Sequence, residues 1–300
     1  MSRIVRYLLI GIGGVVGVLV LCVGVVYAVT GTRIARTVAL PTHAFTAPTD
    51  SASVARGEHL VRSINKCVDC HGTDMAGMTL NEDFMIGTLA GSNITFGKGG
   101  LPADFSDVAF ERAIRHGVRL DGRRLRFMPS EEYQHLSDAD VGAVIAYVRS
   151  VPPVDKERVP LSLGPLARAL HLAGQFPFFG YDLVTHREEV VPSIPEDTTV
   201  AYGEYLGEVG CAGCHGATYG GGKIPGTPPD FPPAANLTPS GIGHYTFDQF
   251  VSTLKTGKRP DGTELKPLMP IAATKLMSDV EFKALWNYLR TLPPKEFGTR

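Results

Sequence analysis

Two copies of the pentapeptide Cys-x-x-Cys-His constrain the fold of this chain more than any other feature of its sequence. They occupy residues 67–71 and 211–215, and a Met-Pro pair follows each copy further downstream, at Met128 and at Met269. Cysteines two residues apart with a histidine directly after them form a compact set of side chains that can hold one bound group. Each copy therefore predicts a local fold organised around its own pentapeptide.

The sequence around the two pentapeptides is also repeated. Matching residues are separated by 140 to 146 positions, whereas the repeats of solenoid proteins have periods of roughly 20 to 50 residues. We therefore expect a duplicated domain, with a complete copy around each pentapeptide. The matching segments are Gly57-Glu58 with Gly203-Glu204, Asn93-Ile94-Thr95 with Asn236-Leu237-Thr238, Asp121-Gly122 with Asp261-Gly262, Tyr147-Val148-Arg149 with Tyr288-Leu289-Arg290, and Pro152-Pro153 with Pro293-Pro294.

The residue types in the pentapeptides point to covalent haem attachment. Two thiols at this spacing add to the vinyl groups of one haem, and the adjacent histidine ligates the iron. A methionine thioether can close the sixth position. We predict two covalently bound haem c groups, attached through Cys67, Cys70, Cys211 and Cys214 and ligated by His71 with Met128 and by His215 with Met269.

Several alternatives use other side chains or another chemistry. A Cys-x-x-Cys pair also occurs in redox dithiols and in zinc sites, but zinc would leave both histidines and both Met-Pro pairs without a role. Methionine also serves as a core residue. The competing sulfur ligands are Met75, Met78, Met85 and Met277, of which Met277 aligns with Leu136 in the repeat. The remaining histidines weighed for a bis-histidine site are His59, His116, His135 and His244, and none aligns with a second histidine.

An apolar segment precedes the duplicated part. Leu8 to Val29 is 22 residues without a charge, which at about 1.5 Å per residue spans the roughly 30 Å hydrocarbon core of a bilayer. A cleaved signal is the alternative, but its apolar region is usually about 7 to 15 residues long and ends in an A-x-A-like site. We predict a retained membrane helix, in which Cys22 is one of the apolar residues.

Periodicity and capping residues predict three main helices in each copy. A closing helix begins at Ser137 with Asp140 three residues on as the expected cap partner. Its counterpart repeats the device at Ser278, with Glu281 completing a capping box. Each middle helix ends before a glycine suited to the left-handed conformation. The opening helices are expected near Val54–Asn65 and Ala201–Val209, and the middle helices near Ser106–His116 and Thr246–Thr256.

This order of helix, pentapeptide, glycine-rich loop, helix, methionine loop and helix resembles class I cytochrome c domains. In that family the first and last helices cross beside the haem, and the sixth ligand lies in the loop before the last helix. The resemblance implies that Gly57 with Tyr147, and Gly203 with Tyr288, make the crossing here. The expected fold is all-α, with two tandem class I cytochrome c domains behind an N-terminal transmembrane helix.

At finer grain the chain resembles the cytochrome c subunits of bacterial membrane-bound alcohol, aldehyde and gluconate dehydrogenases. The resemblance covers roughly residues 52–153 and 198–294, although those subunits typically carry three haem peptides and this chain has two. It implies a bacterial inner membrane protein, single-pass, with its haem domains in the periplasm. The segments that carry it are Ser92–Thr95, His116–Gly122, Met128-Pro129, Leu136–Asp138, Asn236–Pro239 and Gly241–Gly243.

The expected organisation is an anchor over residues 1–30, a linker over 31–51, domain 1 over 52–153, an interdomain strap over 154–197 and domain 2 over 198–300. In the strap we expect a helix near Pro165–Ala173 and an apolar cluster that packs across the two domains, with a quinone site or a partner helix as alternatives. That cluster comprises Phe176, Pro177, Phe178, Phe179 and Tyr181.

A group of arginines precedes Met128 and has two interpretations. It is either a docking patch for an acidic partner or a source of one or two charges for the haem propionates, with the rest solvated. The group comprises Arg115, Arg119, Arg123, Arg124 and Arg126, and the second copy has only Lys258, Arg259 and Lys266 in the equivalent stretch.

Iron ligated by imidazole and thioether has no open position for peroxide or oxygen, which favours electron transfer over catalysis. We predict a carrier of single electrons with no catalytic residue, working with a membrane dehydrogenase, a quinol-oxidising complex, a terminal oxidase or another cytochrome. The alternative is a dihaem peroxidase-type enzyme with one open haem. The net charge of −1 offers no basic field for nucleic acid.

Overall fold

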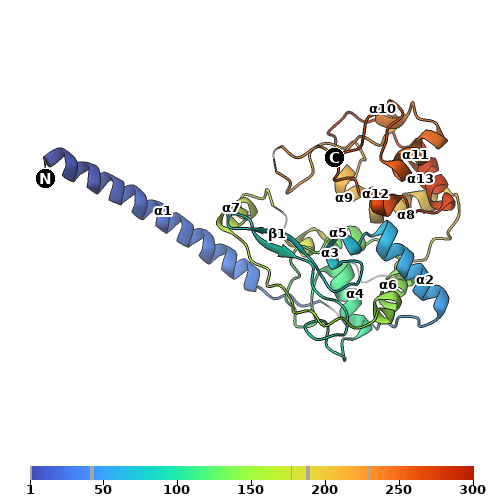
Figure 1. Ribbon diagram of the computed structural model, residues 1–300, viewed down its shortest axis with the longest axis horizontal. Coiled ribbons are helices and arrows are strands. Elements are labelled where there is room, and N and C mark those ends of the chain that lie inside the picture. Colours follow the sequence, from blue (N-terminus) through green and yellow to red (C-terminus); the bar gives the residue numbers. More distant parts are fainter. Residues whose placement is uncertain (1, 41–43, 177, 187–189, 229) are drawn as a thin grey trace.

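The computed structural model describes residues 2–40, 44–176, 178–186, 190–228 and 230–300. A long N-terminal helix projects from a globular part in which two mostly helical halves lie together (Figure 1). The first half contains α2 (Ser51–His59), η1 (Leu60–Ile64), α3 (Val68–His71), α4 (Asp107–His116), α5 (Ser130–Tyr133) and α6 (Asp138–Ser150). The second contains α8 (Val200–Gly210), α9 (Ala212–His215), α10 (Pro239–Ile242), α11 (Phe247–Thr256), α12 (Ile271–Thr274) and α13 (Asp279–Thr291).

The sequence predicted the main helices and their caps. Ser106, Ser137, Thr246 and Ser278 each cap a helix through the side-chain oxygen, and Gly117 and Gly257 take the left-handed conformation after the middle helices. The one sheet among the described residues is a hairpin of β1 (Thr79–Asp83) and β2 (Gly87–Ala90). The all-α expectation is confirmed, with this hairpin as a small addition.

In each half the opening and closing helices cross at a glycine. A Cβ atom on Gly57 would lie 1.9 Å from the carbonyl oxygen of Ala143, and one on Gly203 would lie 2.0 Å from that of Ala284. The same Cβ atoms would lie 2.8 Å and 2.7 Å from the Cβ atoms of Tyr147 and Tyr288. Only glycine permits this approach, so the predicted crossing of α2 with α6 and of α8 with α13 is confirmed.

The first half differs from the second in the segment that leads to its pentapeptide. Gly57 is ten residues before Cys67, whereas Gly203 is eight residues before Cys211. The two extra residues are accommodated by the π-helix η1 and by Lys66, which has a positive φ of 54°. The residues after Leu60–Ile64 contact the other half: Asn65 donates through Nδ2 to the carbonyl of Val209 at 3.2 Å, and Lys66 donates through Nζ to that of Gly210 at 2.5 Å.

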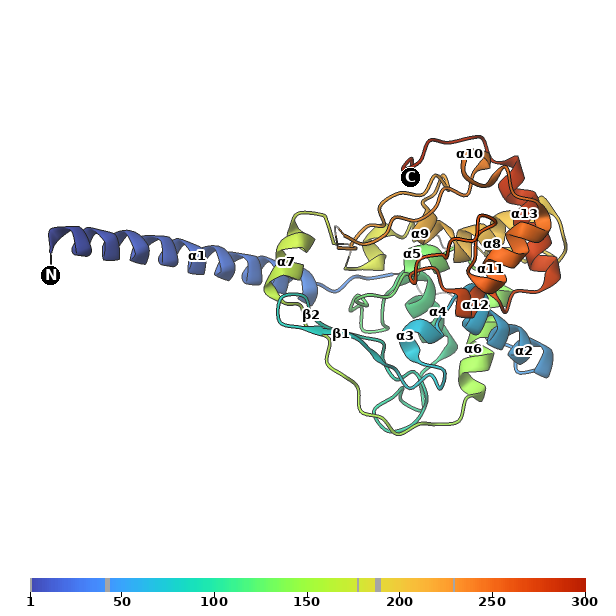
Figure 2. The ribbon, with the colours of Figure 1, turned by 45° about the horizontal axis from the view of Figure 1, so that its top comes forward.

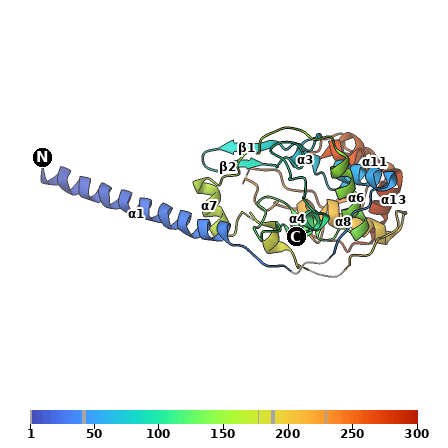
Figure 3. The same cartoon turned by 90° about the horizontal axis from the view of Figure 1, so that it is seen from below.

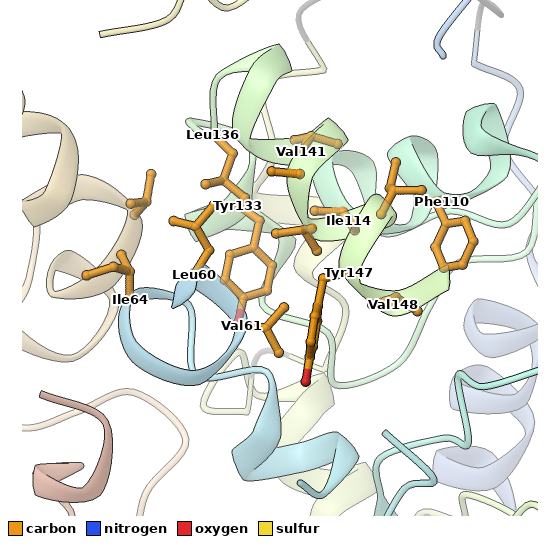
Figure 4. Close-up of a cluster of buried hydrophobic side chains, with 14 of the residues drawn as sticks. Leu60, Val61, Ile64, Phe110, Ile114, Tyr133, Leu136, Val141, Tyr147 and Val148 are labelled. Atoms are coloured by element: carbon orange, nitrogen blue, oxygen red, sulfur yellow. The ribbon is translucent and has the colours of Figure 1, made fainter. Parts of the chain in front are cut away.

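The hydrophobic core of the first half forms where η1, α4, α5 and α6 meet. Figure 4 shows the ring of Tyr133 beside the η1 turn and the side chains of α6 facing it. The Tyr133 hydroxyl donates a hydrogen bond to the carbonyl of Asn65 at 2.8 Å, so its polar atom is paired within the core. The core continues into the second half through Tyr202, Tyr205, Leu206 and Val209.

The halves are joined by an approximately two-fold arrangement of polar contacts. His59 on α2 bonds through Nε2 to Glu281 at the start of α13, at 2.8 Å. Its repeat counterpart Tyr205 on α8 donates to Asp140 at the start of α6, at 2.6 Å. Asp140 also accepts two hydrogen bonds from Arg56, at 2.9 and 3.0 Å. Each opening helix therefore binds the carboxylate that begins the other half's closing helix.

These contacts explain a difference between the two caps. Glu281 closes the predicted capping box by accepting from the Ser278 N–H at 2.8 Å. The shorter Asp140 carboxylate is held by the interface instead, and the Ser137 N–H donates to the Tyr205 hydroxyl at 3.2 Å.

The apolar N-terminal segment forms α1 (Arg3–Ala35), which is long and apolar enough to cross a membrane. A signal sequence near the N-terminus can form a helix of the same length and composition, so the membrane anchor and the signal sequence both agree with α1. The helix continues to Ala35 rather than ending near residue 30, and its end is packed on the strap. There α7 (Pro165–Leu172) contacts α1 through Arg168, whose Nη1 donates to the Thr30 hydroxyl at 2.6 Å.

The aromatic cluster of the strap packs against the first half and the end of α1, not across the two halves. Phe178 and Phe179 are almost fully buried, together with Leu89 of β2, and Ile34 of α1 packs against them. Pro177 lies outside the described residues. The strap continues through η2 (Gly180–Leu183), which lies against α5 of the first half.

Candidate haem sites

The second half contains a cavity in which predicted ligands from three segments meet. Its lining includes Cys214 and His215 from α9 and Met269 from the loop before α12. Most other lining side chains are apolar, and Arg259 and Lys266 are the charged ones among the described residues that line it. The apolar lining suits a porphyrin and the two cations suit its propionates. The residues present therefore fit a haem. The larger apolar side chains of the lining are Ile224, Leu237, Ile242, Tyr245, Phe250, Leu254, Leu265 and Leu268.

In the first half, two of the predicted residues pack against one core. Cys67 and Met128 both pack, partly buried, against the cluster formed by η1, α4, α5 and α6. His71 follows at the end of α3, and Gly72 after it has a φ of 76° that turns the chain away from the site. The second half repeats this device at Gly216, with a φ of 83°. The same glycine turn therefore follows the pentapeptide histidine in both halves.

Each pentapeptide histidine makes one hydrogen bond that fixes its tautomer. Nδ1 of His71 lies 2.8 Å from the carbonyl oxygen of Ser92, and Nδ1 of His215 lies 2.8 Å from that of Ala235. A carbonyl oxygen can only accept, so Nδ1 carries the proton and the lone pair of Nε2 remains for a metal. Burial lowers the pKa of both histidines, which keeps the rings neutral.

The repeated Asn-x-Thr motif holds the loop that supplies these carbonyls. Asn93 donates through Nδ2 to the carbonyls of Val154 and Lys156, at 2.9 and 3.1 Å, and accepts from the Thr95 N–H at 2.9 Å. Ser92, the acceptor for His71, directly precedes it. The asparagine therefore clamps the acceptor loop to the segment after the closing helix.

The second half has the same clamp with fewer contacts. Asn236 donates to the carbonyl of Lys295 at 2.8 Å and accepts from the Thr238 N–H at 2.8 Å. Ala235 precedes it and accepts from His215. The repeated Pro-Pro pairs precede the carbonyls that receive these asparagines, which gives both repeated motifs a common role in placing the histidine.

Sequence reasoning did not identify Ser92 and Ala235, because a backbone carbonyl leaves no mark in the residue type. The sequence signal that could have identified these two acceptors is their position directly before a repeated asparagine. Both acceptors are found at the same place relative to the motif, one residue before Asn93 and one residue before Asn236.

The cysteines lie in surroundings that disfavour thiolate chemistry. Burial raises the pKa of the Cys67 thiol to about 12 and that of the Cys211 thiol to about 11, and it raises the pKa of Cys70 and Cys214 as well. A redox dithiol needs a lowered thiol pKa to be nucleophilic. No group of three or more His, Cys, Asp or Glu side chains suited to a metal ion occurs in the described ranges. The dithiol and zinc alternatives therefore have no support.

The competing methionines lie elsewhere. Met75 is fully buried in the core of the first half, and Met277 packs between the two core clusters, as its alignment with Leu136 indicated. Met78 and Met85 are exposed. Met128 and Met269 remain the methionines at matching places.

The competing histidines have other contacts. His59 binds Glu281, His116 Nδ1 lies 3.2 Å from His186 Nδ1, and His135 lies 3.8 Å from a carboxylate oxygen of Glu208. The ring of His244 packs edge-on against Tyr245, with centroids 4.8 Å apart. These contacts agree with the polar and surface roles expected for them.

Two of the arginines before Met128 are structural. Arg115 is buried and donates to the Asp138 carboxylate at 2.6 Å, which fixes the start of α6. Arg124 pairs with Asp182 at 2.9 Å, lies 4.0 Å from the ring centroid of Phe179 and donates to the carbonyl of Arg33. It thus joins the first half, the strap and α1. Neither guanidinium is placed to dock a partner.

The other three arginines are less constrained. Arg126 is partly buried and donates to the carbonyl of Leu161 at 3.1 Å. Arg119 and Arg123 lie on the surface beside Asp121, at 3.9 and 3.3 Å, so their charge is partly balanced. A docking patch formed by all five arginines is therefore not present in this structure.

Family comparisons agree with this architecture. A model of the cytochrome c oxidase, cbb3-type, subunit III family matches residues 52–148, and a model of the cytochrome c family matches residues 200–293. The chain contains two cytochrome c domains and belongs to the c-type cytochromes.

Several proteins similar to this chain are named as cytochrome subunits of dehydrogenases. It is similar to the fructose dehydrogenase cytochrome subunit of Gluconobacter japonicus, at 27% identity over 86% of this chain and 56% of the relative. The alcohol dehydrogenase (quinone) cytochrome c subunit of Gluconobacter oxydans matches at 27% over 81% and 55%, and the gluconate 2-dehydrogenase cytochrome c subunit of Pantoea cypripedii at 30% over 82% and 61%. The chain spans little more than half the length of these curated relatives.

Proposed function

We propose that this chain is a membrane-anchored dihaem cytochrome c that transfers single electrons as part of a dehydrogenase or respiratory complex. The observation that carries the proposal is the duplicated histidine geometry. In both halves a neutral imidazole donates through Nδ1 to a clamped carbonyl at 2.8 Å and presents Nε2 beside two cysteines.

The cysteines and the iron-ligating side chains have different roles in binding the cofactor. Cys67, Cys70, Cys211 and Cys214 would attach the two haems, and His71 and His215 would bind iron through Nε2, with Met128 and Met269 as the sixth ligands. When bound, each haem supplies a one-electron couple, and a thioether ligand raises its potential. The apolar lining of the cavity in the second half excludes water. In both halves the carbonyl acceptors hold the imidazole planes fixed, which keeps reorganisation small during electron transfer.

We further propose that α1 anchors the chain in a bacterial inner membrane and that both cytochrome domains lie in the periplasm. The length and apolar composition of α1 support the anchor. The names of the similar proteins support a dehydrogenase as the partner. We expect a tagged chain, extracted from native membranes in mild detergent, to carry a flavin- or quinone-dependent dehydrogenase. Recovery with a terminal oxidase alone would redirect the assignment.

Spectroscopy separates electron transfer from peroxidase activity. The oxidised, haem-loaded chain should show the weak red charge-transfer band of methionine-ligated ferric haem with an amplitude for two sites, and it should not turn over peroxide. One high-spin haem together with rapid peroxide consumption would contradict the proposal and favour a dihaem peroxidase-type enzyme.

A further inference from the structure

Three apolar side chains are exposed where the globular part meets α1. Phe84 and Met85, in the turn between β1 and β2, are 83% and 45% exposed, and Leu166 at the start of α7 is 40% exposed. Figures 2 and 3 show α7 beside the end of α1, and Figure 3 shows the hairpin on the other side of α7, at the edge of the globular part from which α1 projects. We call Phe84, Met85 and Leu166 the hairpin patch. Exposed apolar side chains grouped in this way mark an interaction surface.

The hairpin tip is fixed to α7 through the backbone. The Leu166 N–H donates to the Met85 carbonyl at 3.0 Å, and the Gly164 N–H donates to the Ile86 carbonyl at 2.9 Å. The Asp83 carboxylate accepts from the Met85 and Ile86 N–H groups, at 2.7 and 2.8 Å, and so sets the turn. The exposed position of Phe84 is therefore determined by this turn.

The hairpin and α7 are also fixed to α1. Arg168 of α7 donates to the Thr30 hydroxyl and lies 4.3 Å from the ring centroid of Tyr27. Ile34 of α1 packs against the strap cluster, which also contains Leu89 of the hairpin. The hairpin, α7 and the last turns of α1 thus form one packed unit.

This unit sets the height of the hairpin patch relative to a membrane. If the uncharged run from Leu8 to Val29 occupies the hydrocarbon core, Tyr27 lies near its outer boundary, where tyrosine is enriched. Because Arg168 contacts both Tyr27 and Thr30, α7 lies at the level of the lipid headgroups. Arg33 of α1, just beyond Thr30, falls at the same level.

We propose that the hairpin patch inserts into the interfacial layer of the lipid bilayer on the side where α1 ends. This inference rests on the proposed membrane anchoring by α1 and adds a second, shallow contact to it. A single helix allows the whole chain to tilt and to rotate about the helix axis in the membrane, whereas two contacts fix the first cytochrome domain in one orientation on the membrane. Burial of the Phe84 ring in the interface provides the favourable free energy.

The test uses photocrosslinking of the full-length, haem-loaded chain. Benzoylphenylalanine replaces Phe84 in one variant and Phe297 in a second, because Phe297 is a similarly exposed aromatic residue (62%) in the segment after α13. A third variant carries it at Val18 in the middle of α1. Each is reconstituted into liposomes of phosphatidylethanolamine and phosphatidylglycerol and irradiated, and lipid adducts are measured by mass spectrometry. Phe84 is too exposed for its replacement to disturb the core, which an unchanged haem spectrum verifies.

We expect the yield of lipid adducts at position 84 to be several-fold above that at position 297 and comparable to that at position 18. A yield at 84 no higher than at 297, with adducts still abundant at 18, overturns the hairpin patch and leaves the anchor in place. Absence of adducts at 18 as well overturns the anchor and the patch together. If the patch instead covers a partner protein, position 84 gives no lipid adduct in these liposomes, which also overturns the proposal.

Discussion

Phe127 and Leu268 each precede the predicted methionine ligand of their domain, and their surroundings differ. The Phe127 ring packs against Phe176 and Phe178 of the strap, with centroids 5.9 and 6.5 Å apart, and its N–H donates to the Phe178 carbonyl at 3.0 Å. Leu268 is 38% exposed and lines the cavity of the second domain. The methionine loop is therefore covered in the first domain and open in the second.

Features that occur in both domains can be distinguished from features that occur around the first domain. The helix crossing, the histidine-to-carbonyl bond and the asparagine clamp occur in both domains, which indicates that they serve the site. The strap, the hairpin and the contacts to α1 occur only around the first domain within the described ranges. Substitutions in the shared features should therefore have equal effects in the two domains. Substitutions in features that differ between the domains should have unequal effects.

The largest effect is expected at the helix crossing, and it should be equal in the two domains. Gly57→Ala and Gly203→Ala each place a Cβ within about 2 Å of a backbone carbonyl, so the helices must separate. We expect each to destabilise its domain by about 3 kcal/mol and to lower haem content per chain. Gly31→Ala in α1, where a Cβ meets nothing within 4 Å, is the control and should not destabilise the chain, because alanine favours a helix more than glycine does. If one of the two variants, Gly57→Ala or Gly203→Ala, were as stable as the unaltered chain and the other were not, the two helix crossings would not be equivalent.

Replacing the predicted sixth ligands should show the asymmetry. Met128→Leu and Met269→Leu should each lower the potential of one haem by on the order of 0.1 V, measured by redox titration. Added imidazole should bind faster to the Met269→Leu variant because its loop is exposed, whereas the strap covers the loop of Met128. Equal rates in stopped-flow measurements would show that the strap does not restrict access.

The asparagine clamp should be stronger in the first domain. Asn93→Ala removes two donated and two accepted hydrogen bonds within buried surroundings, whereas Asn236→Ala removes one donated and two accepted bonds. We expect a loss of about 2 kcal/mol for Asn93→Ala, against about 1 kcal/mol for Asn236→Ala. Asn93→Asp keeps the acceptor for Thr95 but turns a carboxylate oxygen toward the carbonyl oxygens of Val154 and Lys156, so it should be at least as destabilising as Asn93→Ala. Chemical shifts of the haem methyl groups in NMR spectra should report rotation of the histidine. Unchanged shifts in the alanine variants would argue against the proposed clamp.

The smallest effect concerns pH. Burial works to raise the pKa of Glu281, but the hydrogen bonds from His59 and the Ser278 N–H and the charge of Arg56 outweigh it and hold this pKa below its ordinary value. A lowered pKa stabilises the folded state above the unfolded-state pKa, and this contribution is lost as the pH falls below about 4.5. Glu281→Gln should therefore flatten the acid limb of the unfolding midpoint against pH. An unchanged acid limb would exclude a contribution from this contact.

Much of the fold was predictable because local signals agree with the tertiary structure. Ser106, Ser137, Thr246 and Ser278 mark helix starts by their own chemistry, and Gly57 marks the crossing. The grouping of His215, Cys214 and Met269 around one cavity agrees with the order of motifs.

Other features depend on distant contacts that leave no local pattern. The role of Arg124 depends on Asp182 and Phe179, and the Asp140 carboxylate is held by residues of α2 and α8 rather than by its own cap. The histidine acceptors are backbone atoms. The location of the aromatic strap cluster follows from the end of α1, which the repeat does not contain.

The most direct test of the central claim is the intact mass of the denatured, acid-extracted chain from a host that matures c-type cytochromes. The account predicts the mass of the polypeptide plus two haems, and the double variant Cys67→Ala, Cys70→Ala should keep only the haem of the second domain. A mass without haem would contradict the account altogether, and a single haem on the unaltered chain would contradict the equivalence of the two sites.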